Sequence, residues 1–427
     1  MIHLKKGEKM RNLKIIGLLI LSIVIFYSCS EILYNKDDSP SSSLNSIPKS
    51  ITTSQNNFAF ELLKNINREQ PDSNIFISPI SASLALTMTM NGAAGETYQE
   101  MNKVLGYNTA DREKLNASCK ALINELYELS GGIEFNLANS IWLNDNFTLQ
   151  EEFKNLNEEY FNAKIEALDF SQVENCVDII NSWVEDKTKD RIKDLVNESD
   201  FAGPTLMFLI NAIYFKASWK YQFSEEKTSE SDFYLNNGDN VKCQMMQMKE
   251  EFSYYSNSDI QAIDLIYANE NYSMTILLLR DKNELDSLLD NTDGPELDKI
   301  IDNFKMDSVN LFMPRLELDY KKELKKNLVD MGMAKAFQRD QADFSKMVNE
   351  MDDGIFIDKV RQKSFLKIEE KGTEAAAATV VTMKYTSIGE GDEIYMRINH
   401  PFLFFIRERR TGTILFSGKI MEPKWED

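Results

Sequence analysis

The run "TLMFLINAIYF" at residues 205–215 constrains the fold of this chain more than any other segment. A strand with one face in water alternates apolar and polar residues, whereas a strand covered on both faces can be apolar at nearly every position. This run is apolar almost throughout, so we expect it to be a central strand of a sheet. The rest of the chain must then supply elements that cover that sheet on both sides.

Helical and strand-like patterns divide the region 54–427 into two parts. Apolar residues recur at three-to-four spacing and predict helices at 55–68, 80–91, 96–105, 111–129 and 174–189. Strand-like runs dominate the remainder, at 133–143, 205–217, 241–254, 261–266, 273–279, 306–318, 355–369, 394–398, 402–408 and 412–420. We find no second linker and no repeat, so the pattern predicts one large α+β domain.

The first 28 residues have the composition of an export signal. Five basic residues precede the apolar run 15–27, which ends at Ser28-Cys29 and is too short to span a membrane comfortably. The signal is complete from Met10 as well as from Met1, so either residue can be the true start. The following residues, 29–53, are rich in Ser and Pro from position 37 onward and are expected to form a flexible tether.

Cys29 directly after the apolar run resembles the lipobox of bacterial lipoproteins, in which this Cys carries the lipid. Phe26 and Tyr27 are bulkier than the usual residues, so an ordinary signal peptide is the alternative. The resemblance implies an exported outer-membrane lipoprotein. The segment 36–38, "KDD", resembles the acidic signal that sends some lipoproteins to the cell surface, with a solvated charge run in a linker as the other interpretation.

Charge and rare residues exclude several classes of function. Loss of the signal removes five basic residues and one acidic residue, which takes the net charge from −20 to −24 and disfavours binding to nucleic acid or anionic membranes. Cys119, Cys176 and Cys243 are too widely spaced for a disulfide framework or a zinc site. Only His400 remains for a catalytic triad, so the sequence predicts neither an enzyme nor a bound metal or cofactor.

The segment "EEKGTEAAAATVVTMKYTS", residues 369–387, carries two conflicting signals. Its first half is typical of a helix start, with Thr373 as the N-cap and four alanines following. Its second half, from Thr379, is rich in β-branched residues and favours a strand. Local propensity alone favours a surface helix, and it leaves the second half unexplained.

Four separated blocks of the sequence resemble the serpin family, the large serine-protease-inhibitor fold. They are "NIFISPISASLALTMTMNGAAGET" (74–97), "INAIYFKASWKYQF" (210–223), "EEKGTEAAAAT" (369–379) and "HPFLFFIRERRTGTILFSGKIMEP" (400–423). The resemblance covers essentially all of 54–427. It implies a serpin fold with a helix-rich N-terminal part, a large central mixed sheet, further sheets and an exposed reactive-centre loop at about 370–393.

The resemblance implies a suicide-substrate inhibitor of serine proteases, with cysteine proteases as a second target class. In the family the protease cleaves the loop and forms an acyl-enzyme, and the loop then inserts into the central sheet as a new strand. The hinge would consist of Glu370, Gly372, Thr373, Glu374, Ala375, Ala376, Ala377, Ala378 and Thr379. Alternation along a strand separates Thr373, Ala375, Ala377 and Thr379 from Glu374, Ala376 and Ala378, so the set without Glu374 is small enough to enter the core.

Counting along the loop as in inhibitory serpins places the scissile bond at Thr386–Ser387. A small Thr suits an elastase-like protease, whereas Lys384 would suit a trypsin-like enzyme and Tyr385 a chymotrypsin-like one. The partner is therefore expected to be a protease, bound by a monomer. The alternative is a non-inhibitory binding protein with the serpin fold.

A buried network beneath the sheet is also implied by the resemblance. Many serpins place a His before the hinge, where it bonds to a Ser and an Asn. Here the aligned residue is Gln362, and the partners would be Ser78, Ser81 and Asn211. A Gln both donates and accepts hydrogen bonds, so we expect the network to persist without the pH dependence of a His.

Overall fold

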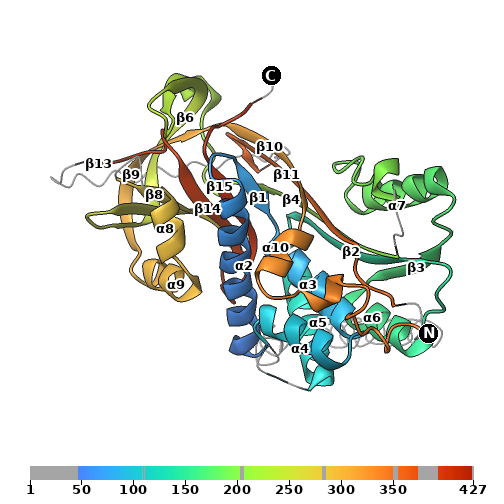
Figure 1. Ribbon diagram of the computed structural model, residues 1–427. Coiled ribbons are helices and arrows are strands. Elements are labelled where there is room, and N and C mark those ends of the chain that lie inside the picture. The colour runs from blue at the N-terminus through green and yellow to red at the C-terminus, as the bar shows by residue number, and fades with distance from the viewer. Residues whose placement is uncertain are drawn as a thin grey trace, which may run out of the picture. The chain divides into compact units, whose positions relative to one another are not determined.

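The structure is a computed structural model that describes residues 47–107, 109, 111–201, 206–280, 285–349, 354–373 and 393–425. These residues belong to a compact unit that begins at Ile47 (Figure 1). The predicted signal, Cys29 and most of the predicted tether lie outside the described residues.

The helices gather mainly in the N-terminal third and after the middle of the chain. They are α2 (Lys49–Glu69), α3 (Pro79–Met90), α4 (Gly95–Val104), α5 (Arg112–Glu128), α6 (Glu151–Phe161), α7 (Val173–Lys187), α8 (Leu285–Asn291), α9 (Gly294–Asp302) and α10 (Lys325–Asp330).

The strands of the described residues form two sheets. The central sheet has the order β10 (Leu316–Glu323), β11 (Lys359–Glu369), β12 (Gly372–Thr373), β4 (Met207–Ser218), β2 (Glu134–Asn144) and β3 (Lys164–Leu168). The second sheet has the order β1 (Ile75–Ile77), β15 (Ile414–Ile420), β14 (Phe402–Glu408), β8 (Tyr272–Leu279), β7 (Ile260–Ile266), β6 (Asn240–Ser256), β9 (Lys305–Pro314) and β13 (Ile394–Arg397), and β5 (Ser229–Tyr234) pairs with β6. The α+β architecture predicted from the sequence is confirmed.

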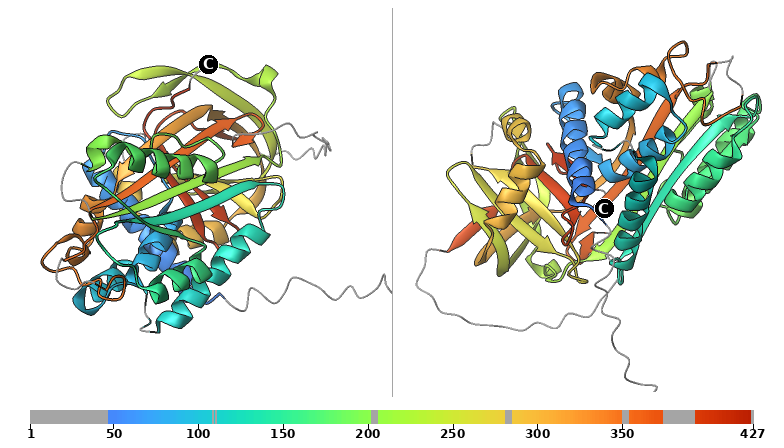
Figure 2. Two further views of the ribbon diagram at one scale, coloured as in Figure 1. Left: turned by 90° about the vertical axis from the view of Figure 1, so that its right-hand side faces the viewer. Right: turned by 90° about the horizontal axis from the view of Figure 1, so that it is seen from below.

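Strand β4 is covered on both faces, as its apolar run predicts. Leu209 and Ile213 lie in the main core, to which α3 contributes, whereas Phe208 and Ile210 belong to a second core under α7. The view from below shows α7 on the outer side of the sheet and the N-terminal helices on the other side (Figure 2, right). The sheet is therefore the middle layer of three.

The segment 188–201, which follows α7, crosses the outer face of the central sheet. Its apolar side chains, among them Leu195 and Phe201, pack with residues of β4 in the second core. Its Asp200 carboxylate accepts a hydrogen bond from Lys359 of β11 at 3.1 Å and also pairs with Arg361 of the same strand. The segment thus contacts both strands of the β11–β4 pair from outside.

Several boundaries differ from the sequence prediction; the strand predicted from residue 355, for example, begins at Lys359. Residues 49–53, predicted to belong to the Ser/Pro-rich tether, form the first turn of α2, where the Thr52 hydroxyl donates to the Lys49 carbonyl at 3.0 Å and Ile51 is buried. The predicted strand 306–318 is divided at Arg315 into β9, which pairs with β6 of the second sheet, and β10, which pairs with β11 of the central sheet.

Candidate functional site

The hinge begins inside the central sheet. Strand β12 runs antiparallel to both of its neighbours, with Thr373 opposite Ile368 of β11 and opposite Ala217 of β4. Farther along the sheet, residues 359–364 of β11 pair directly with residues 208–213 of β4 in parallel. The two strands are therefore separated at one end, where β12 lies between them, and joined at the other.

Gly372 is required at the entrance to this gap. Its φ is +152°, and a Cβ at this position would lie 2.1 Å from the Ala217 carbonyl oxygen. No side chain can be accommodated so close to a backbone oxygen unless the backbone moves. Gly372 therefore permits both a backbone conformation that other residues rarely adopt and the close approach of β12 to the backbone of β4.

Aromatic side chains hold the other hinge residues. The Thr373 hydroxyl is hydrogen-bonded to the Tyr267 hydroxyl at 2.7 Å, and the ring of Tyr267 stacks on Trp219 with centroids 4.6 Å apart. Trp219 in turn donates its indole N–H to the Glu369 carbonyl at 3.1 Å and its backbone N–H to the Lys371 carbonyl at 2.9 Å. Burial raises the pKa of Tyr267, so the phenol remains a neutral hydrogen-bonding group.

Glu370 anchors the turn between β11 and β12. Its side chain is only 4% exposed, and the Nη2 of Arg315 lies 2.7 Å from one carboxylate oxygen. The Nε of Arg315 lies 2.9 and 3.0 Å from the two oxygens, and the Thr228 hydroxyl also donates to the carboxylate. Burial alone would raise the pKa of Glu370, but Arg315 and Thr228 together hold it below its usual value, so the group is ionised.

The four residues expected to form a network beneath the sheet lie together. Gln362 accepts from the Ser78 backbone N–H at 3.0 Å and donates to the Ser78 carbonyl at 2.8 Å and to Asn211 Oδ1 at 2.6 Å. Asn211 donates to the Ser81 hydroxyl and, at 2.5 Å, to Asn139 Oδ1. The network joins β11, β4 and α3 without a titratable side chain.

Asn139 is the member of this network that the sequence did not indicate. It lies on β2 directly opposite Asn211, and the Ser81 hydroxyl donates to it at 3.3 Å. The available signal was an amide within the predicted strand 133–143. That signal could not identify a partner, because the register between β2 and β4 is set by the tertiary fold.

The remaining predicted site residues lie outside the described residues. These are Glu374, Ala375, Ala376, Ala377, Ala378, Thr379, Lys384, Tyr385, Thr386, Ser387 and Cys29. The hinge as described therefore ends at Thr373.

His400 and the cysteines occupy structural positions. The ring Nε2 of His400 lies 2.7 Å from the Leu279 carbonyl, and its Nδ1 lies 3.1 Å from Asn399 Oδ1. Cys119, Cys176 and Cys243 are buried free thiols. Within the described ranges we find no cluster of three or more potential metal ligands and no helix that could cross a membrane.

Comparison with known families defines the class of protein. Residues 53–423 match the family model for serpin (serine protease inhibitor). The chain therefore belongs to the serpin family.

Relatives occur in distant organisms. Over 363 residues the chain is 33% identical to human neuroserpin, with 83% of this chain and 87% of that protein covered. It is 30% identical over 377 residues to an uncharacterized serpin-like protein of Methanosarcina acetivorans, covering 88% and 87%.

Solved structures of serpins have the same fold. The thermophilic serpin tengpin in its native state matches with a TM-score of 0.81 at 29% identity, covering 88% of this chain and 95% of tengpin. Human thyroxine-binding globulin in complex with thyroxine matches with a TM-score of 0.80 at 28% identity, covering 88% and 99%.

Proposed function

We propose that this serpin inhibits serine proteases, with cysteine proteases as a second class, by trapping them after loop cleavage. The catalytic nucleophile of the protease attacks the carbonyl carbon of Thr386, and the amine of Ser387 leaves. Lys384 and Tyr385 provide alternative sites of attack. The freed N-terminal part of the loop then enters the central sheet and carries the acylated protease with it.

The observation that carries this proposal is the position of β12. Two residues of the hinge already pair with β11 on one side and with β4 on the other. If the same register continues, each further residue of the loop meets one residue of β11 and one of β4. Strand β12 therefore sets the register in which the rest of the loop would insert.

Continuation of this register brings Thr379 opposite both Gln362 and Asn211. These two residues now face each other across the direct β11–β4 pair. A strand inserted between them would move their backbones to about 10 Å apart, twice the usual spacing of neighbouring strands. Thr379 would then occupy the place of their mutual hydrogen bond, and its hydroxyl can both donate and accept.

The composition of the hinge supports the same mechanism. Thr373 points into the core, where it is buried against Tyr267. By alternation, Ala375, Ala377 and Thr379 would follow it inward and Glu374 would remain on the outer face. Every inward residue is small, so insertion requires little displacement of the core.

The test compares two matched arginine variants with the wild type. Each protein is incubated with elastase-, trypsin- and chymotrypsin-like proteases, and SDS-stable complexes and cleavage sites are determined by gel and mass spectrometry. Ala377→Arg would bury a charge and should give cleaved loop without complex, whereas Glu374→Arg, on the outer face between the partly exposed Lys367 and Lys216, should retain complex formation. Cleavage of the wild type without any stable complex would refute the proposal.

The similarity to thyroxine-binding globulin, which was solved with a small molecule bound, favours a second candidate function. In this alternative the chain is a non-inhibitory binding protein with the serpin fold. Its loop would be cleaved without complex formation and without the increase in thermal stability that insertion should produce. The same incubations, followed by thermal unfolding of the cleaved product, distinguish the two candidates.

We further propose that the inhibitor acts outside the cell as an outer-membrane lipoprotein tethered through Cys29. The sequence before residue 47 is the support for this proposal. Metabolic labelling with a radioactive fatty acid should mark the wild-type protein and not Cys29→Ser. Protease accessibility on intact cells would then establish whether the lipoprotein faces outward.

A further inference from the structure

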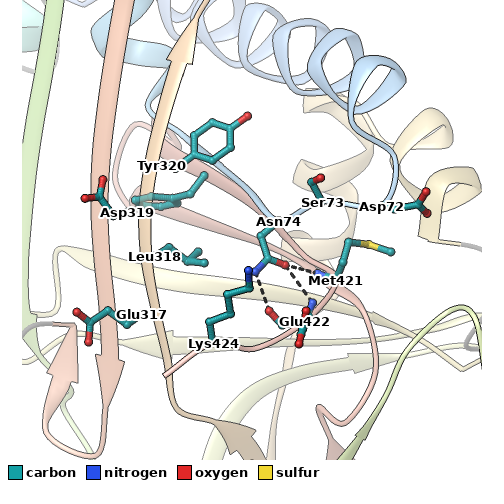
Figure 3. A pocket seen from close by; sticks show the side chains of 11 residues that line it. Asp72, Ser73, Asn74, Glu317, Leu318, Asp319, Tyr320, Met421, Glu422 and Lys424 are labelled. Atoms are coloured by element: carbon teal, nitrogen blue, oxygen red, sulfur yellow. Dashed lines mark hydrogen bonds between the residues drawn. The ribbon is translucent and has the colours of Figure 1, made fainter. Parts of the chain in front are cut away.

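The C-terminal segment Met421–Trp425 is fastened to the protein at two points. Asn74 Oδ1 accepts from the backbone N–H groups of Met421 at 2.7 Å and Glu422 at 3.0 Å, and its amide donates to the Glu422 carbonyl at 2.7 Å (Figure 3). Farther along, the Lys424 carbonyl accepts from the Glu317 N–H at the start of β10 at 2.7 Å. These contacts fix the backbone on both sides of Pro423.

The segment carries an aromatic ring over two cations. The ring of Trp425 lies 5.2 Å from the guanidinium carbon of Arg315 and 4.3 Å from the ammonium of Lys367. Lys367 belongs to β11 and is also paired with Glu317 at 2.8 Å. Arg315 is the residue that holds Glu370 at the β11–β12 turn.

The two contacts of Arg315 are compatible because a guanidinium is planar. Its N–H groups donate in the plane, toward Glu370, while its face can lie against an aromatic ring. Arg315 is 23% exposed, so water reaches part of it. A ring over the guanidinium limits that access, and an ion pair is stronger where water is excluded.

We propose that Trp425 is a positioning residue for the hinge. By covering Arg315 it strengthens the Arg315–Glu370 pair, and this pair keeps β12 between β11 and β4. The C-terminal segment is thus a clamp on the hinge, made by residues far from it in sequence. The consequence for inhibition rests on the proposed function, since a hinge released from the sheet would have to re-enter it before the loop could insert.

Hydrogen exchange on the uncleaved, full-length protein tests the clamp without any protease. Amide exchange is measured by mass spectrometry in peptides that cover β12 and its partner residues Ala217 and Ser218. Trp425→Ala should accelerate this exchange about fivefold, as expected for one cation–aromatic contact, and Trp425→Phe should restore most of the protection. The matched control is Tyr160→Ala, which removes a ring 5.3 Å from Lys120, away from the hinge.

Two further measurements separate the clamp from a general structural role. In a Glu370→Gln background, Trp425→Ala should have little additional effect, because the pair that it protects is already lost. Exchange in Trp425→Ala should also become more sensitive to salt than in the wild type, since the pair is then exposed. Should Trp425→Ala fail to fold, Trp425→Leu keeps the apolar bulk and is measured in its place.

The proposal would be overturned if Trp425→Ala, or Trp425→Leu measured in its place, left the exchange of the β12 region unchanged. It would also be overturned if the substitution accelerated exchange as much in the Glu370→Gln background as in the wild type. These outcomes do not depend on whether the protein inhibits proteases. Failure of the clamp and failure of the proposed function are therefore distinguishable.

Discussion

Replacement of Thr379 by Val should weaken the inserted form and leave the uncleaved form unchanged. In the uncleaved protein Gln362 donates to Asn211 Oδ1 at 2.6 Å, and Thr379 lies beyond the two residues of β12. After insertion that donor is out of reach, and the Thr379 hydroxyl is the group that can replace it. A Val of nearly the same shape cannot donate, so it leaves a buried acceptor on Asn211, which is 0% exposed.

The expected cost is about 1–3 kcal/mol, the usual penalty for a buried polar atom left without a partner. Gln362 contributes less to this cost because its two bonds to Ser78 can persist. The assay is guanidinium chloride unfolding of uncleaved and loop-cleaved protein, for the wild type and for Thr379→Val. The matched control is Thr382→Val, which makes the same chemical change on the opposite face of the inserted strand.

Only the cleaved form of Thr379→Val should unfold at a lower denaturant concentration than the wild type. If its cleaved form were as stable as that of the wild type, Thr379 would not face Asn211. The register deduced from β12 would then be refuted. If Thr382→Val had the larger effect, the inserted strand would be shifted by three residues, an odd number that exchanges its two faces and brings Thr382 opposite Asn211.

Three further predictions concern the hinge, the outer face of the sheet and a buried lysine. Gly372→Ala should lower the ratio of stable complex to cleaved product on gels, because its Cβ would meet the Ala217 oxygen at 2.1 Å. Asp200→Asn should destabilise the uncleaved form by about 1–3 kcal/mol in denaturant unfolding, since a neutral amide pairs less well with the cations of β11. Burial lowers the pKa of Lys419 from 10.5 to about 8, so between these values the unfolded chain binds more protons. Stability should therefore rise with pH from about 8 to 10.5, and Lys419→Met should abolish this rise.

The long elements of the fold could be predicted from the sequence because their patterns are local. The apolar run at 205–215 corresponds to β4, and the helical spacing at 111–129 corresponds to α5. The helices α6, α8, α9 and α10 and the strands β3 and β5 were not predicted. Strand β3 has only five residues, too few to establish a period of two, and its pairing with β2 depends on the tertiary fold.

The residues of the hinge could be predicted from the sequence, but their contacts with residues far away in the sequence could not. The family resemblance singled out Glu370 and Gly372, but the pattern does not reveal that Arg315 is the partner of Glu370. Arg315 lies inside the segment 306–318, which was predicted as one strand. In the structure it is the residue between β9 and β10, and there its side chain pairs with Glu370. Trp425 has no recognisable motif around it. Its contact with Arg315 exists only because the chain returns to β10 at its C-terminal end.

The proposed insertion would increase the number of backbone hydrogen bonds in the central sheet. Where β11 and β4 are direct neighbours, one parallel ladder joins residues 359–364 of β11 to residues 208–213 of β4. Insertion would exchange this ladder for two antiparallel ones, which is a gain in backbone hydrogen bonds and in pairing geometry. The conversion is opposed by contacts that must first break, namely the Gln362–Asn211 bond inside and the Asp200 contacts outside. Substitutions at these positions should therefore alter the rate of insertion, whereas Thr379 should alter mainly the stability of the product.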